Sequence, residues 1–235
     1  MPKMGGLMGG KRRFRVDKRG AIGIEILIVF IAIVLVAAVS AAVLIHTVGF
    51  LQQRALTTGK QTTQEVASGI KVVKVMGHVD SPRTASATVD KMAIYVEVNT
   101  GGQDVDLAAT RLILANESKS LTLYYNTSDT NKSFTDATAG ITDIFDTSID
   151  AWAQLSSKEF GIIVLQDEDG SLSAEYPVLN PGDKVVLTVD ITQTFGAGFE
   201  PREDVSGEVR PEFGAPGIIE FTTPPAYTTA IVELQ

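Results

Sequence analysis

The most apolar part of the chain is a run in which Ser40 is the only polar residue between Ile26 and Ile45. About 20 apolar residues in a helix are enough to cross the hydrocarbon core of a bilayer, which is about 30 Å thick. The apolar region of an ordinary secretory signal is usually only about 7–15 residues long. The run therefore favours a membrane-spanning helix over a secretory signal or a buried core helix.

The helical pattern continues beyond this run. No proline occurs between Pro2 and Pro82, and apolar residues keep a helical spacing at Val66, Ile70 and Val73. We expect one long helix from about Ile24 to Gly77, which would measure about 80 Å at about 1.5 Å per residue. Three glycines would weaken it and could mark bends: Gly49, Gly59 and Gly69. The alternative is that a strand begins within residues 72–75.

From about Val79 the pattern changes to short segments of alternating polar and β-branched residues. Turn sequences separate them at "DEDG" (167–170) and "NPGD" (180–183). Seven segments are predicted to be strands: residues 92–98, 111–115, 121–125, 161–166, 184–191, 217–223 and 228–234. The chain is thus predicted to have an α+β fold, a long amino-terminal helix followed by an antiparallel β-sandwich of immunoglobulin-like type.

Charge is distributed unevenly along the chain. Residues 1–20 hold seven Lys or Arg against Asp17 alone, a net charge of +6, which leaves −14 for the rest of a chain whose total is −8. A basic flank before an apolar helix is typical of the cytoplasmic side of a membrane, so the remainder is expected outside the cell. The acidic body speaks against nucleic acid as a partner, because such binding depends on Lys and Arg at the phosphates.

Small residues recur at a spacing of four within the apolar run. Ala37 and Ala41 share one helical face, and Ala38 and Ala42 share a neighbouring face. Faces of this kind let another backbone approach closely in the membrane. A helix that is longer than the membrane is thick also needs a partner beyond the lipid, and another copy of the same chain is the partner we expect.

Residues suited to catalysis are sparse. There is no cysteine, the two histidines (His46 and His78) are far apart in the sequence, and no nucleophile-elbow, Walker or zinc-ligand spacing is present. The carboxylates of Asp104, Asp106 and residues 167–169 could hold a calcium or magnesium ion, but solvated turns explain them better. We therefore expect neither an enzyme nor a required cofactor.

Two segments in order, "KRGAIGIE" from Lys18 and "LIVFIAIVLVAAVSAAVLIHTVGFLQQRALTTGKQTTQEVASG" from Leu27, resemble the amino-terminal region of archaellins, the subunits of the archaeal swimming filament. The resemblance covers residues 18–78 closely. Later pieces such as "LNPGDKVVLTVDI" (179–191) and "EFTTPPAY" (220–227) are similar more loosely. The resemblance implies a structural subunit of the archaeal flagellum that polymerises through its amino-terminal helix.

The resemblance also implies processing. A prepilin-type peptidase would cut between Gly20 and Ala21, so that residues 1–20 form a leader, residues 21–78 a polymerisation helix and residues 79–235 the outer domain. Glu25 would then be the fifth residue and pair with a new amino terminus, which offsets part of the cost of burying either charge. The alternative is that Glu25 lies at the wet membrane edge and is favoured by the helix dipole.

The partners implied by the resemblance are the chain itself, related archaellins, the peptidase, the cytoplasmic membrane before assembly, and an assembly ATPase with its platform. The mature subunit would lie in an extracellular filament on the cell surface. The runner-up function is a single-pass membrane-anchored or pilus-type β-sandwich protein for adhesion or binding.

Three N-glycosylation sequons fall within a short segment that is predicted to lie outside the cell, and they begin at Asn116, Asn126 and Asn131. Asn180 precedes a proline, which excludes it. We expect at least one of the three to carry a glycan, and the alternative is that they are simply polar turn residues.

Overall fold

The computed structural model describes residues 18–99, 101–128 and 132–235, and the side chains of residues 18–22, 64 and 67 lie outside this description. The chain divides into two compact units, one that ends at Thr58 and one from Gly59 to Gln235. Residues 1–17, most of the predicted leader, fall outside the described part of the chain.

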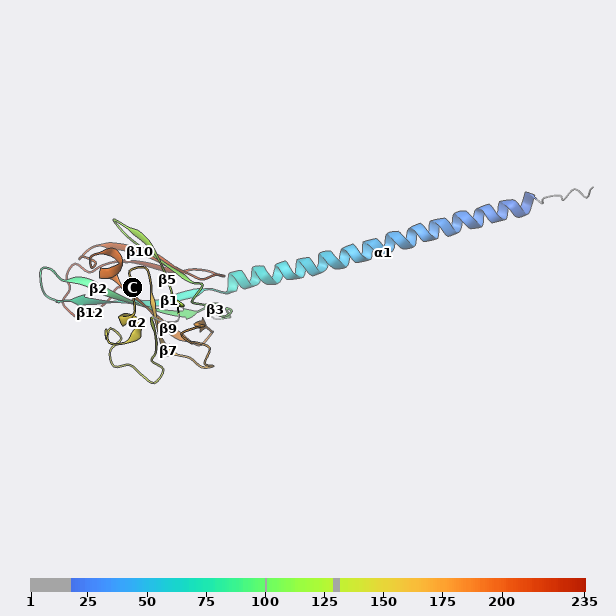
Figure 1. Ribbon diagram of the computed structural model, residues 1–235. Coiled ribbons are helices and arrows are strands. Elements are labelled where there is room, and N and C mark those ends of the chain that lie inside the picture. The colour runs from blue at the N-terminus through green and yellow to red at the C-terminus, as the bar shows by residue number, and fades with distance from the viewer. Residues whose placement is uncertain (1–17, 100, 129–131) are drawn as a thin grey trace, which may run out of the picture. The chain divides into compact units, whose positions relative to one another are not determined.

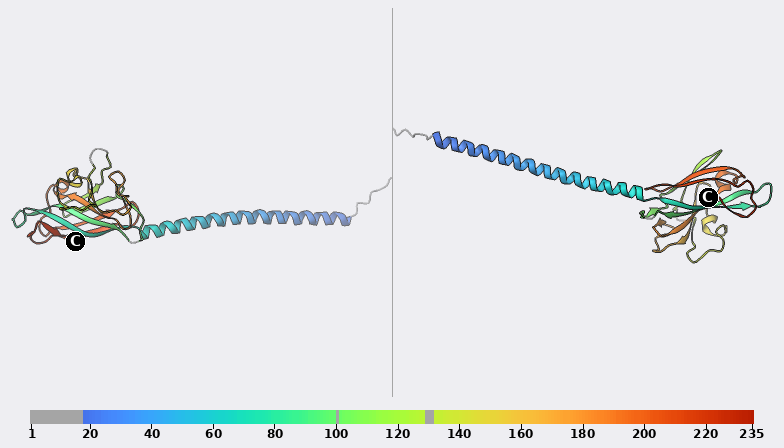
Figure 2. Two further views of the ribbon diagram at one scale, coloured as in Figure 1. Left: turned by 90° about the horizontal axis from the view of Figure 1, so that it is seen from below. Right: turned by 180° about the vertical axis from the view of Figure 1, so that it is seen from behind.

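Helix α1 runs without a break from Lys18 to Ala67 (Figures 1 and 2). Its 50 residues include the whole apolar run and, at about 1.5 Å per residue, exceed the length needed to cross a bilayer. Neither Gly49 nor Gly59 interrupts it. Long runs of Ala, Leu and Ile without proline favour the helix here despite these glycines.

The larger sheet has six strands in the order β12-β1-β2-β9-β7-β6. All neighbours are antiparallel except β6 and β7, which are parallel. Its strands, in chain order, are β1 (Ile70–Asp80), β2 (Thr88–Val98), β6 (Phe134–Asp136), β7 (Gly161–Gln166), β9 (Lys184–Asp190) and β12 (Ile231–Glu233).

The second sheet has four antiparallel strands in the order β11-β10-β4-β5. These are β4 (Arg111–Asn116), β5 (Ser120–Tyr124), β10 (Asp204–Arg210) and β11 (Gly217–Thr222). A small antiparallel pair joins β3 (Val105–Asp106) to β8 (Val178–Leu179). Two short helices complete the described elements, α2 (Asp150–Ala153) and α3 (Ile191–Phe195).

The two large sheets enclose the main core. Alternate residues of both sheets meet there, among them Ile94, Ile162, Leu112 and Val209, all fully buried. A second apolar cluster covers the opposite face of the six-stranded sheet, where Trp152 of α2 packs with neighbouring side chains. Figure 1 shows β10 and α2 on opposite sides of this sheet. The expected α+β architecture, a long helix followed by an antiparallel β-rich domain, is confirmed.

The expected end of the helix was wrong. α1 ends at Ala67, and residues 70–80 form β1. The helix predicted to reach about Gly77 and the polymerisation helix predicted to reach residue 78 are therefore both too long. The alternative, a strand near residues 72–75, is the one found. The reason is long-range pairing: β1 joins β2 over its whole length, with a bulge between Val72 and Lys74. β-branched residues favour the strand once such a partner is present.

Each of the seven segments predicted as strands overlaps a strand of the structure, although β12 is shorter than expected. The central strand β10 was missed because its sequence, "DVSGEVR", is mostly polar and contains a glycine. Only Val205 and Val209 face the core. Gly207 is needed where the strands approach closely, since a Cβ there would lie 2.4 Å from the carbonyl oxygen of Ile113.

Candidate assembly site

The run of α1 from Ile26 to Ile45 is apolar on all sides except at Ser40. Every large apolar side chain from Ile24 to Leu56 is exposed, with fractions between 48% at Val34 and 74% at Ile45. The segment Gly23–Thr63 has a mean hydropathy of 3.2 for its most apolar window and no buried share, so it is long and apolar enough to cross a membrane. A helix that is hydrophobic all round belongs inside a membrane or among other helices.

The four alanines of the predicted packing faces lie on this exposed surface: Ala37, Ala38, Ala41 and Ala42. Each pair at a spacing of four forms a shallow strip between larger side chains. Gly49 adds another position with open space, because a Cβ there would meet nothing within 4 Å. The arrangement allows a second backbone to approach α1 closely, which is how helices associate where no water is present.

The predicted processing site lies in the first turn of α1. The backbone of Gly20 and Ala21 is helical, and their side chains are outside the described part of the chain. Glu25 follows one turn later and is exposed. Within the described residues it forms no ion pair, so the structure leaves its carboxylate available to a charged group from elsewhere.

Beyond the apolar run, α1 becomes polar without exposing unsatisfied hydroxyl groups. Thr47, Thr57 and Thr63 each donate their hydroxyl to the backbone carbonyl four residues earlier, at 2.8–2.9 Å. Threonines bonded in this way are tolerated on a helix that enters an apolar environment. The guanidinium of Arg54 lies 5.8 Å from the ring centre of Phe50, within the range of a cation–π contact.

The two described sequons lie at the hairpin β4–β5. Asn116 ends β4, and its amide nitrogen donates to Glu203 Oε1 at 2.8 Å. Asn126 follows β5 and donates in the same way to Glu159 Oε1 at 3.1 Å. Both side-chain oxygens accept backbone N–H groups of their own turns. Asn131 lies outside the described residues.

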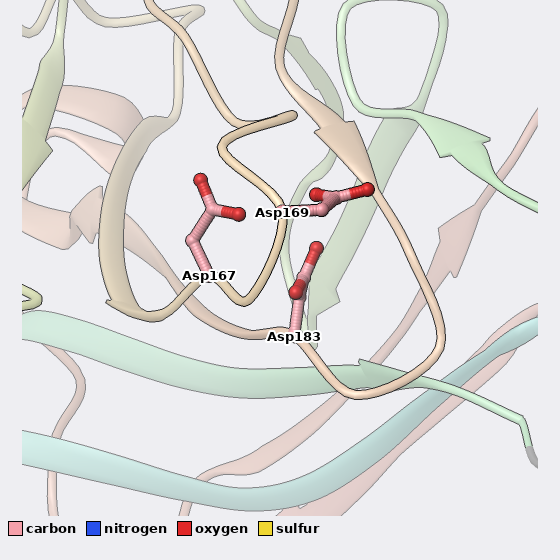
Figure 3. A group of neighbouring side chains, drawn as sticks. All are labelled: Asp167, Asp169 and Asp183. Carbon is pink, nitrogen blue, oxygen red and sulfur yellow. The ribbon is translucent and has the colours of Figure 1, made fainter.

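Three carboxylates converge in the loops next to β8 and β9: Asp167, Asp169 and Asp183 (Figure 3). One oxygen of each lies within 4.8 Å of the other two. Oxygen ligands at this spacing could hold a divalent cation such as calcium. The sequence indicated Asp167 and Asp169 but missed Asp183, which comes from the neighbouring "NPGD" turn and is buried. Asp104 and Asp106 are not part of this group; Asp106 instead accepts the backbone N–H of Ala108.

The same carboxylates also organise the two turns by hydrogen bonding. Asp167 accepts the backbone N–H groups of Gly170 and Leu172, and Asp183 accepts those of Glu168 and Asn180. Hydrogen bonds from Ser171, chiefly through its side chain, and from Asn180 lower the pKa of Asp169 below its ordinary value. The cluster therefore has a structural role in these loops that requires no ion.

The two histidines have separate surroundings. His46 is an exposed residue of α1. His78 lies on β1 with its Nδ1 atom 2.6 Å from Asp90 Oδ1 and its ring 5.5 Å from that of Phe145. The carboxylate and the aromatic ring fix the orientation of this imidazole. Sequence reasoning missed the contact because Asp90 reaches His78 only through the pairing of β1 with β2.

The family model of archaeal-type flagellin matches residues 20–221. Flagellin B1 of Methanocaldococcus jannaschii is 47% identical over 223 residues, which cover 94% of this chain and 98% of that protein. Flagellin B3 of Thermococcus kodakarensis is 43% identical over 253 residues, which cover 93% and 98%.

Two solved structures are similar in fold. The crystal structure of archaeal flagellin FlaB1 from M. jannaschii is 40% identical, with a TM-score of 0.64, and the match covers 72% of this chain and 98% of that one. The archaeal flagellum of Methanospirillum hungatei strain JF1 has a TM-score of 0.57 at 20% identity, with 89% and 98% covered. At this lower identity the second likeness concerns the fold alone.

Proposed function

Because the chain belongs to the archaeal-type flagellins, we propose that it is a structural subunit of an archaeal flagellar filament, which polymerises through α1 and serves swimming motility. The observation that carries this proposal is the apolar surface of residues 26–45 of α1, none of which is buried within the chain. A solved relative in fold is itself an archaeal flagellum.

The energetics of α1 favour two environments in succession. In water, each large apolar side chain would forgo about 1.5–3 kcal/mol of burial free energy, so the helix must lie in lipid or among other helices. Moving from lipid into a filament core gains little hydrophobic free energy, because lipid tails are as apolar as leucine. Close packing at Ala37, Ala38, Ala41 and Ala42 supplies the attraction instead.

Processing precedes assembly in this proposal. The basic leader, residues 1–20, holds the amino terminus on the cytoplasmic side of the membrane, where a prepilin-type peptidase cuts between Gly20 and Ala21. An assembly ATPase and its platform then move the subunit out of the membrane into an extracellular filament. Since the chain itself offers no nucleotide-binding loop, the energy for this transfer comes from that partner.

Glu25 pairs with the amino terminus that cleavage creates, on its own chain or on a neighbour. Both groups are charged and both enter an apolar core, where either one alone would be strongly unfavourable. An ammonium and a carboxylate that must meet also fix the register between neighbouring helices. The exposed position of Glu25 near the start of α1 is consistent with this role.

Asn116 and Asn126 are the described candidates for glycosylation, and Asn131 is the third. Each described side chain uses its amide nitrogen as a donor to a glutamate. A glycan replaces only one of the two hydrogens on that nitrogen, so the remaining N–H can keep the bond. Modification and the folded hairpin are therefore compatible.

The test is the amino terminus and mass of the subunit in filaments sheared from cells. We expect peptides that begin at Ala21, and an intact mass above that of residues 21–235 if a glycan is present. Gly20→Arg should leave a longer subunit in the membrane fraction and cells without filaments. A native subunit that still contains residues before Ala21 would contradict the proposal and favour an uncleaved, single-pass β-sandwich protein for adhesion.

A further inference from the structure

The connection between α1 and β1 consists of Ser68 and Gly69, which we call the joint. Ser and Gly in a connecting segment usually indicate a flexible linker. Here both residues are buried, and Ser68 is only 4% exposed. The joint belongs to the same compact unit as the sheets, the unit from Gly59 to Gln235.

Three hydrogen bonds hold the joint to two loops of the outer domain, and a fourth holds the residue that follows it. The Ala215 N–H donates to the carbonyl oxygen of Ser68 at 2.9 Å, and the Gln103 N–H donates to the Ser68 hydroxyl at 3.1 Å. The Asn99 N–H donates to the carbonyl oxygen of Gly69 at 3.0 Å. The next residue, Ile70, donates its N–H to the carbonyl oxygen of Ala215 at 3.2 Å. Both backbone carbonyls of the joint are therefore satisfied by the outer domain.

Glycines let the backbones come this close. A Cβ on Gly69 would lie 2.7 Å from the carbonyl oxygen of Ala215, and one on Gly214 would lie 2.4 Å from that of Ser68. Gly214 also has a φ of +98°, which other residues rarely adopt. The glycines on both sides thus serve close approach rather than flexibility.

We propose that Ser68 and Gly69 form a locked joint: the segment between the end of α1 and the start of β1 is held rigidly by two loops of the outer domain and does not act as a flexible linker. Such rigidity requires that the backbone at the joint cannot turn freely about its own dihedral angles. Hydrogen bonds on both carbonyls and contacts on both sides remove that freedom. The rigidity of the joint does not depend on the proposed filament function.

Hydrogen exchange on the full-length chain in detergent tests the rigidity directly. In the unsubstituted chain we expect the N–H groups of Ile70, Asn99, Gln103 and Ala215 to exchange as slowly as those of the central strands. Gly214→Ala should speed their exchange at least tenfold, because its methyl group displaces the Ser68 carbonyl. Gly140→Ala is the matched control, since Gly140 has a φ of +103° and open space around its Cβ position. It should leave the joint unchanged.

Ser68→Ala is a milder variant that cannot disrupt the fold through strain. It removes only the acceptor for the Gln103 N–H, and we expect exchange there to rise several-fold while the strands stay protected. Rapid exchange at the joint of the unsubstituted chain, or an equal effect of Gly140→Ala and Gly214→Ala, would overturn the proposal. A failure of the chain to form filaments would instead count against the proposed function, because exchange in detergent does not depend on assembly.

Discussion

Helix α1 and the outer domain use apolar residues in opposite ways. In α1 the large apolar side chains point outward, and none of the segment Gly23–Thr63 is buried by the rest of the chain. In the outer domain they alternate inward from two sheets, and side chains such as Phe160 and Ile94 are fully buried. The outer domain therefore completes its core within one chain, whereas α1 requires lipid or other chains to complete its packing.

This difference separates stability from assembly. Damage to the core between the sheets should unfold the outer domain in every environment, because all of the contacts that stabilise it are internal. Damage to the surface of α1 should leave that domain folded and affect only insertion or polymerisation. The single tryptophan, Trp152, is buried in the second cluster and reports unfolding of the outer domain alone.

The largest effect is expected from Phe160→Ala. Phe160 is fully buried in the main core, with its ring centre 6.2 Å from that of Tyr125. Its truncation should lower the free energy of unfolding by about 3–5 kcal/mol, measured by Trp152 fluorescence in denaturant. Phe213→Ala is the control because Phe213 is 66% exposed; it should change stability by no more than about 0.5 kcal/mol. Equal losses in the two variants would contradict the assignment of the core.

A charge on the apolar helix should produce the next largest effect. Val36 is 67% exposed near the centre of the apolar run. An aspartate at the centre of a membrane helix costs about 2.5–3.5 kcal/mol, so Val36→Asp should reduce incorporation into filaments roughly 100-fold.

The control for that variant is Val36→Leu, which keeps the apolar surface and should assemble normally. Quantitative immunoblotting of sheared filaments against the total subunit in the cells gives the ratio. The Trp152 unfolding curve of Val36→Asp should match that of the unsubstituted chain. Normal incorporation of the aspartate variant would mean that this part of α1 does not enter an apolar core.

A smaller effect is expected at Gln235, whose side chain links the two sheets. Its Oε1 atom accepts the Glu220 N–H at 2.9 Å, and its Nε2 atom donates to the carbonyl oxygen of Ile218 at 3.3 Å. The amide thus occupies part of the free edge of β11, as a neighbouring strand would. Gln235→Ala should cost about 0.5–1.5 kcal/mol and speed exchange of the Glu220 N–H.

Gln235→Glu tests the same contact more finely, because it keeps the acceptor and loses the donor. In thermal unfolding, Gln235→Glu should lose some stability, but less than Gln235→Ala. If Gln235→Ala leaves Glu220 exchange unchanged, the side chain does not cover this edge in solution.

A further effect concerns alkaline pH. Burial raises the pKa of Tyr125 to about 12, and its hydroxyl donates to the carbonyl oxygen of Ala174 at 2.9 Å. A raised pKa means that the folded state favours the neutral phenol. The contribution of the neutral Tyr125 to the free energy of unfolding is therefore complete below about pH 10 and is lost as the pH rises toward 12. Titration of one group changes the free energy of unfolding by at most about 1.4 kcal/mol per pH unit.

Tyr125→Phe removes this titration together with the hydrogen bond. The variant should be less stable than the unsubstituted chain at neutral pH by about 1 kcal/mol. The difference in stability between the two proteins should narrow between pH 10 and 12, measured by thermal unfolding followed through Trp152 fluorescence. A gap that stays constant over this range would show that Tyr125 does not ionise with the shifted pKa.

Elements that depend on neighbouring residues could be predicted from the sequence, whereas elements that depend on long-range pairing could not. The apolar run, the strand segments such as 161–166 and the turns at 167–170 and 180–183 were predictable because each depends on neighbours in the sequence. Strand β10 was not, since its polar residues face solvent and only its pairing with β4 and β11 defines it. Asp183 joined the other two carboxylates through the fold, from a turn that the sequence showed only as a turn.

The sequence by itself determined that the chain has an apolar helix with an incomplete core and a β-rich domain with a complete one, because residue type and period set which faces avoid water. Only the tertiary structure decided where one ends and the other begins. Residues 70–80 are compatible with both a helix and a strand, and they became β1 because β2 supplied backbone partners along their whole length. The same contacts buried Ser68 and Gly69, a pair that the sequence pattern placed inside the helix, with Gly69 as a possible bend.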